Sequence, residues 1–235
     1  MPASSRDRTD DGFYLVRDPV SDPPFRGWIV PGSEASWAFG GAEARPDSPV
    51  QVEWAMGAAT PSDVVWTTSA GLPVVSRRVI QLLERGGFTG WETYPVDLTD
   101  KARNWVPGYA GLMIHGRCDA VDLSRSEIVL LEFPGGWFPN FRGHFFRPES
   151  WDGSDLFIER KGERGSGSGA LHATARLIRA LRRDRIKNLR IEHTSAVEVS
   201  VAVYTSGVAS GVPADLEARL AQAYARLGVP RPASV

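Results

Sequence analysis

Cys118 is the residue whose chemistry would matter most, because it is the only cysteine among 235 residues and lies close to His115 and Asp119. A thiolate activated by a neighbouring base is a common enzymatic nucleophile. The segment around it carries no signature of a cysteine enzyme, and a lone cysteine after a strand is typical of a small buried hydrophobic residue. We therefore predict no catalytic residue and no enzymatic activity. An enzyme that uses Cys118 or His144 stays open as an alternative.

Metal and cofactor sites are not expected either. The four histidines, His115, His144, His172 and His193, share none of the spacings that place two ligands on one metal ion. One cysteine forms neither an internal disulfide nor a CxxC pair. The glycine- and serine-rich segment 165–169 lacks the Gly-Lys-Ser/Thr that completes a phosphate-binding loop. We expect a flexible loop there, no metal and no cofactor.

Aromatic and basic side chains alternate between residues 134 and 147, a composition that suits contact with another protein. Tryptophan, tyrosine and arginine are enriched where binding energy concentrates in protein interfaces. A surface loop anchored by its own phenylalanines is the competing interpretation. The residues predicted to contact a partner here are Trp137, Phe138, Phe141, Arg142 and His144.

A second candidate surface is a predicted helix over residues 176–190, which contains seven basic residues and one acidic residue, Asp184. Such a helix can be a solvated face, can bind nucleic acid, or can dock an acidic protein. Nucleic acid is not the expected partner, because motifs that read or stack on bases are missing. Arg179 and Arg183 are the preferred contacts. The bases are Arg176, Arg179, Arg182, Arg183, Arg185, Lys187 and Arg190.

The basic residues of the second candidate surface lie partly within an internal repeat. Residues 75–85 align without a gap on residues 173–183, and the identities include two arginines, an isoleucine and a leucine. Ser76 and Thr174 open the two copies, and both residue types cap helix N-termini. Self-similarity at a fixed offset indicates repeated architecture. We expect each copy to form a helix followed by a strand.

The predicted fold class is α+β: a mixed, largely antiparallel sheet with two repeated helix-strand units and a C-terminal helix over residues 214–227. Residues 1–11 are predicted to be a disordered tail, and residues 12–62 an N-terminal region of strands and loops. Residues 63–235 are predicted to form the repeated domain, in one compact unit with 12–62.

Composition excludes several classes of function. The chain has 27 Lys and Arg against 28 Asp and Glu, a formal net charge of −1, so no overall field attracts nucleic acid. The N-terminus has no apolar core of a signal peptide, and apolar runs fall short of a membrane span. We expect a cytoplasmic protein that does not enter a membrane.

Residues 73–84, with Gly87 to Trp91, resemble a bacterial family of polymorphic-toxin immunity proteins, the type-eleven immunity group. In that family a Val-Val-Ser-x-Arg stretch leads through paired leucines to a Gly-Leu-Thr-Gly turn and a strand. Residues 118–126 are similar to its Asp-Ala-Leu-Asp-x-x-Ser segment. Residues 145–147 and 171–189 are similar to its second helical unit.

Residues 151–157 also resemble a related paralogous family of myxobacteria, whose members carry two CxxCG motifs that this chain lacks. Both resemblances lie within about residues 63–192. They imply a protein that binds and neutralises a cognate toxin without chemistry of its own. A small enzyme or a nucleic-acid-binding protein remains the alternative.

Overall fold

The computed structural model describes most of the chain, and its residues form two compact units. The tail predicted for residues 1–11 and the loop predicted at 165–169 lie outside the described residues. Strands from both sides of residue 62 share one core, which includes Val16 and Val64. The described residues are 12–19, 24–33, 46, 48–67, 73–118, 121–159, 170–205 and 212–231. The first unit takes its residues from segments 1–117, 153–158 and 169–191, and the second from 118–152, 159–168 and 192–235.

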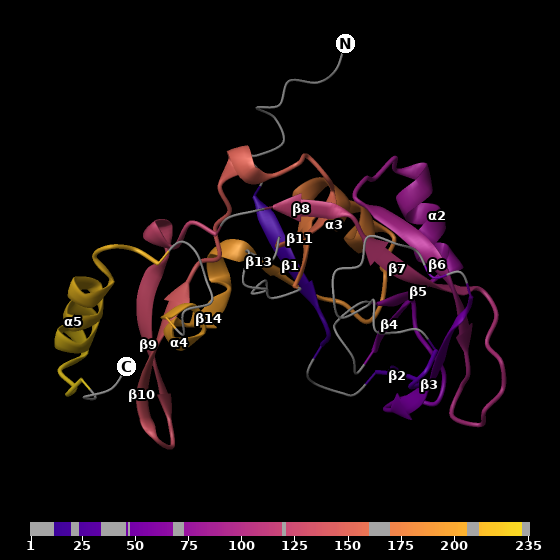
Figure 1. Cartoon of the computed structure of the whole chain (residues 1–235), viewed down its shortest axis with the longest axis horizontal. Helices are drawn as coiled ribbons and strands as arrows, with labels where there is room; N and C mark the ends of the chain where they lie inside the picture. The colour runs from indigo at the N-terminus through magenta and orange to yellow at the C-terminus, as the bar shows by residue number, and fades with distance from the viewer. Residues whose placement is uncertain are drawn as a thin grey trace, which may run out of the picture. The chain divides into compact units, whose positions relative to one another are not determined.

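Six strands of the first unit close into a barrel in the order β2-β3-β6-β7-β5-β4 (Figure 1). Two parallel pairings complete the closure, β2 with β4 and β3 with β6. These pairings join strands distant in sequence, and no local pattern in the chain predicts them. The strands are β2 (Arg26–Ile29), β3 (Val50–Met56), β4 (Val64–Thr67), β5 (Val74–Ser76), β6 (Trp91–Leu98) and β7 (Tyr109–Ile114).

A five-stranded sheet has the order β13-β1-β12-β11-β8, in which β12 pairs antiparallel with both β1 and β11. Helices α2 (Arg77–Arg85) and α3 (Ala175–Arg183) each follow directly on a strand, β5 and β12. The predicted mixed α/β character is confirmed, and the barrel is an addition to it. The strands are β1 (Phe13–Arg17), β8 (Gly116–Cys118), β11 (Leu156–Glu159), β12 (Leu171–Thr174) and β13 (Arg190–His193).

The two copies of the repeated segment have matching surroundings. We name β4-β5-α2-β6 the first repeat and β11-β12-α3-β13 the second repeat. β5 pairs antiparallel with β7, placing Ser76 opposite Tyr109, and β12 pairs antiparallel with β1, placing Thr174 opposite Phe13. β1 therefore serves the second repeat as β7 serves the first, although β1 comes from the other end of the chain.

One apolar core joins the two repeats. Strands β4 and β5 are buried on both faces, so their sequences are continuous hydrophobic runs. Alternate residues face the barrel interior, as Val65 and Val74 do, or the core beneath the helices, as Val64 and Val75 do. That second core also takes its helical residues from both α2 and α3: Val79, Leu82, Leu83, Leu177, Ile178, Ala180 and Leu181.

The second unit is built on a hairpin of β9 (Glu127–Phe133) and β10 (Gly136–Arg142), with β14 (Glu198–Ser200) beside β10 (Figure 1). The C-terminal helix α5 (Leu216–Leu227) contacts β9, and its Tyr224 hydroxyl donates to the Trp137 carbonyl at 3.1 Å. The strand predicted over residues 197–203 ends early, because residues 201–205 form the short helix α4. Short 3-10 turns cover Leu123–Arg125, Pro148–Ser150 and Thr194–Ala196.

Within the described part of the chain, each helix is too short or too polar to cross a membrane.

Candidate functional site

A groove in the first unit runs between α2 and α3 and has a volume of about 590 Å³. Its walls carry guanidinium groups from both repeats, and its apolar lining comes from Leu82, Phe88 and Ala180. Two sequence-predicted contacts, Arg179 and Arg183, lie on it. The lining residues are Leu82, Arg85, Gly86, Phe88, Arg176, Arg179, Ala180, Arg183 and Asp184.

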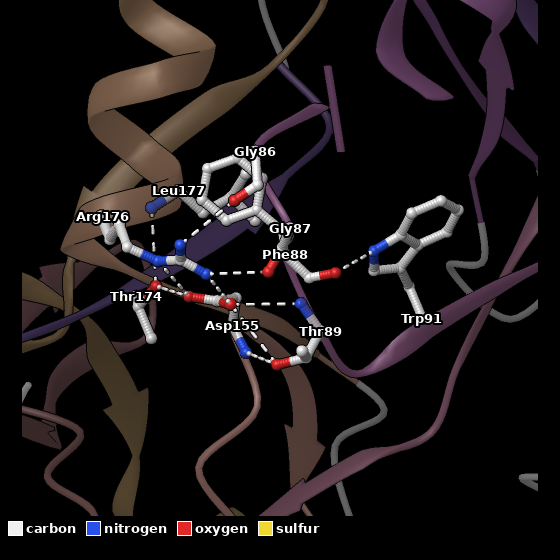
Figure 2. A network of polar contacts seen from close by, with 9 residues as sticks. All are labelled: Gly86, Gly87, Phe88, Thr89, Trp91, Asp155, Thr174, Arg176 and Leu177. Atoms are coloured by element: carbon white, nitrogen blue, oxygen red, sulfur yellow. Dashed lines mark hydrogen bonds and ion pairs between the residues drawn. The ribbon is translucent and has the colours of Figure 1, made fainter. Parts of the chain in front are cut away.

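Below the groove, buried Asp155 holds the second repeat to the first (Figure 2). Its Oδ1 accepts hydrogen bonds from Thr174 Oγ1 at 2.9 Å and Arg176 Nε at 3.1 Å, and its Oδ2 accepts from the Thr89 backbone N–H at 3.1 Å. Burial by itself would raise the pKa of this carboxyl. The hydrogen bonds from Arg176, Thr174 and Thr89 and the charge of Arg176 outweigh burial, so the pKa lies below its ordinary value.

Arg176 is fixed by more than its ion pair. Its guanidinium lies 4.4 Å from the centre of the Phe88 ring, and it donates to the carbonyls of Gly86 and Gly87, each at 3.2 Å (Figure 2). The last carbonyls of a helix have no partner within the helix. Arg176 thus supplies donors to the C-terminal end of α2, which makes it primarily a structural residue of the groove.

The first repeat carries the matching arrangement at Asp63. This carboxylate accepts from Ser76 Oγ at 3.3 Å, Arg78 Nη1 at 3.0 Å and the Lys187 backbone N–H at 2.9 Å. Arg78 also donates to the carbonyl of Asp184, at the C-terminal end of α3. Each repeat therefore sends one arginine to the end of the other repeat's helix.

Arg85, Arg183 and Asp184 form a surface cluster in the groove. Arg183 Nε lies 2.9 Å from one oxygen of Asp184, and Arg85 Nη2 lies 3.7 Å from the other. The hydrogen bond from Arg183, with the nearby arginine charges, lowers the pKa of Asp184. The Arg85 and Arg183 side chains stay 69% and 74% exposed. Such exposed pairs are weak, so both guanidiniums keep most of their capacity to bind an anion.

The predicted basic helix is shorter than expected. Helix α3 ends at Arg183, Arg185 and Asn188 have left-handed φ angles of 51° and 67°, and Arg190 lies in β13. The seven bases therefore do not form one helical face. The turn after α2 has glycines with positive φ angles at the equivalent positions, 87 and 90. Both helices therefore end at the same point of the shared backbone, although the sequence after Arg183 is rich in basic residues.

The second unit holds the other predicted contacts, and two of these are buried. Phe141 is 1% exposed and His144 is 4% exposed, so neither side chain lies at the surface of the described residues. Inward-facing positions of a strand alternate with outward-facing ones, and Phe141 falls on the inward face of β10. Trp137 is half-buried, and exposed Arg142 pairs with Glu198 at 2.8 Å.

His144 is enclosed by its own unit. Its ring stacks on Phe146 with centroids 5.0 Å apart, and Nε2 lies 4.0 Å from Glu159 Oε2. Burial lowers the pKa of His144 to about 4, because the cation loses its hydration. The ring is therefore neutral near pH 7 and is packed inside its own unit.

The end of the β9–β10 hairpin carries the most exposed aromatic pair of the described second unit. Phe133 and Phe138 are 51% and 45% exposed, with their rings edge to face at 5.8 Å. Phe138 was among the contact residues predicted from the sequence, and Phe133 was not. The Pro134-Gly135 turn between two strand-like runs is the signal that would have paired them.

Cys118 is buried, and its Sγ lies 3.2 Å from Ser150 Oγ. Asp119, its predicted neighbour, lies outside the described residues. No group of three or more His, Cys, Asp or Glu side chains in the described segments is arranged to hold a metal ion.

Sequence reasoning did not find Asp63, Asp155, Arg78 or Arg176 as a set. The signal was present, because an aspartate directly precedes the first strand of each repeat and an arginine stands at the second position after the second strand. Comparisons with known proteins add no relative, since no family model and no curated protein matches the chain.

Proposed function

We propose that this chain is an immunity-type binding protein that neutralises a cognate bacterial toxin by protein–protein contact, without catalysis. The observation that carries the proposal is the arginine-lined groove between α2 and α3. A groove of this size with exposed Arg85, Arg179 and Arg183 suits contact with a protein surface, because arginine is enriched in interfaces. The resemblance of residues 63–192 to the type-eleven immunity group supports the same function.

The hairpin surface, Phe133 and Phe138, is a second contact surface within the same function. Exposed aromatic pairs bury a large apolar area on binding. It lies in the other compact unit, so each surface needs its own variants. Variants at Arg179 and Arg183 test the groove, and Phe138→Ala tests the hairpin.

Co-purification from the native lysate tests the function itself. We expect one stoichiometric partner that is toxic when expressed alone and harmless when co-expressed with this chain. A partner that stays toxic in the presence of this chain contradicts the proposal. Recovery of many nucleic-acid-associated proteins favours the nucleic-acid alternative instead.

A further inference from the structure

The groove lies between two structures related by a local two-fold. From the end of the second strand through the helix of each repeat, equivalent positions differ by 98. Three groove-lining pairs follow this offset: Leu82 and Ala180, Arg85 and Arg183, Gly86 and Asp184. Their backbones also match, since Gly86 N–H donates to Leu82 and Asp184 N–H donates to Ala180, both at 3.0 Å.

Reciprocal contacts support this symmetry. Arg176 donates to Gly86, and Arg78, its counterpart, donates to Asp184, the counterpart of Gly86. When residue i contacts j and the equivalent of j contacts the equivalent of i, the relation is that of a two-fold interface. The groove thus presents Arg85 and Arg183 as a symmetric pair from the last turns of two helices.

The stability of the two helices explains part of the positive charge in the groove but not all of it. A helix C-terminus carries partial negative charge that basic residues in the last turn offset, which accounts for Arg85 and Arg183. Arg179 lies in the middle of α3, where the helix dipole does not favour a cation. Its counterpart is Gln81, so this arginine is not required by the shared backbone plan.

We propose that the groove binds an acidic segment of the partner protein, in which two carboxylates are held by Arg179 with Arg85 or Arg183. Guanidinium groups match carboxylates in geometry and form bidentate pairs. Half-buried Phe88, with the small exposed parts of Leu82 and Ala180, forms an apolar wall beside them that suits a segment alternating acidic and apolar residues. This inference rests on the proposed function, because it names the chemistry of the partner at the same site.

A protein segment fits better than a nucleic-acid backbone. Asp184 lies inside the groove, where its negative charge opposes a continuous row of phosphates but still allows spaced carboxylates to reach the arginines. Nucleic-acid backbones also need basic contacts along an extended track. The short helix α3 and the turn after it interrupt such a track.

Calorimetric titration of the intact chain tests the inference with three probes: a peptide of alternating Glu and Leu, a matched peptide of alternating Lys and Leu, and a single-stranded oligonucleotide. We expect the Glu peptide alone to bind. The double variant Arg179→Gln, Arg183→Gln should weaken this binding by about tenfold or more, since charge-assisted hydrogen bonds are lost. Arg77→Gln is the matched control, because Arg77 is exposed on α2 outside the groove lining, and it should leave the affinity unchanged.

Gln81→Arg supplies a gain-of-function test, because it places an arginine at the position equivalent to Arg179. We expect tighter binding of the Glu peptide. Three results would overturn the inference: no binding of the Glu peptide, an equal loss with Arg77→Gln, or stronger binding of the oligonucleotide. Circular dichroism of each variant shows that the fold is retained.

The same variants separate this inference from the proposed function. If the double variant still neutralises a captured toxin with unchanged affinity, the groove proposal fails and the immunity function stands. If the groove binds the Glu peptide but no captured partner is neutralised, the immunity function fails and the acidic-segment site stands.

Discussion

Asp63 and Asp155 stand at matching positions in the two repeats, yet their polar surroundings differ. Asp155 accepts hydrogen bonds from a threonine hydroxyl, an arginine and the backbone and hydroxyl of Thr89. Asp63 accepts a longer bond from the hydroxyl of Ser76, at 3.3 Å, and a bond from Arg78. Lys187 stands where Thr89 would be and donates through its backbone N–H, because it has no hydroxyl. A shared backbone plan therefore does not imply equal stabilisation, because side-chain donors decide how well a carboxylate is satisfied.

Removing the two carboxylates should give the largest difference between the repeats. Asp155→Ala leaves Thr89, Thr174 and Arg176 without their acceptor, and we expect a loss of about 2–3 kcal/mol in the free energy of unfolding. Asp63→Ala should cost about 1 kcal/mol, because its partner Arg78 is half exposed. Urea unfolding followed by tryptophan fluorescence measures both. Equal losses would show that the donor set does not distinguish the repeats.

The residues at the N-caps should differ in the same direction. Thr174 Oγ1 donates to Asp155 and also accepts from the Leu177 N–H, whereas Ser76 makes no side-chain cap bond and donates to Asp63 instead. We expect Thr174→Ala to cost about 1–2 kcal/mol and Ser76→Ala about 0.5 kcal/mol. Thermal unfolding of the two variants compares them. A larger loss at Ser76 would contradict this assignment.

The acid dependence of stability should show the smallest effect. The folded state holds the pKa of Asp155 below its ordinary value of 3.8, so the folded protein binds this proton less readily than the unfolded chain. The contribution is fully present above the ordinary value and is lost as pH falls through the folded-state pKa. Urea unfolding across the acid range should show a steeper loss for the native chain than for Asp155→Ala. Parallel curves would mean that another carboxyl controls this range.

The two repeats also differ in the arginines that they contribute to the groove. Arg85 and Arg183 occupy equivalent positions, so both repeats carry an arginine there. Arg179 has no such counterpart, because the first repeat has Gln81 at the equivalent position. The helix dipole favours a cation at the first two positions, which lie at helix ends, and does not favour one at the third. The Arg179 and Gln81 variants therefore probe what one repeat has gained beyond the shared structure.

The sequence by itself determined the repeated helices, their starting residues and most strands. These are local features: an apolar face at helical spacing, hydroxyl residues before each helix and glycines or polar residues after it. The repeat at a constant offset shows the same features in two places of the sequence. The same local logic placed Arg179 and Arg183 on a helix exposed to solvent.

Only the tertiary structure decided which segments meet. The barrel closes through parallel pairings between distant strands, and β1 completes the second repeat from the far end of the chain. The burial of Phe141 and His144 and the exchange of Arg78 and Arg176 between repeats likewise depend on contacts between remote segments. Local propensity carries no information about such contacts, because their free energy is gained only when the whole core assembles.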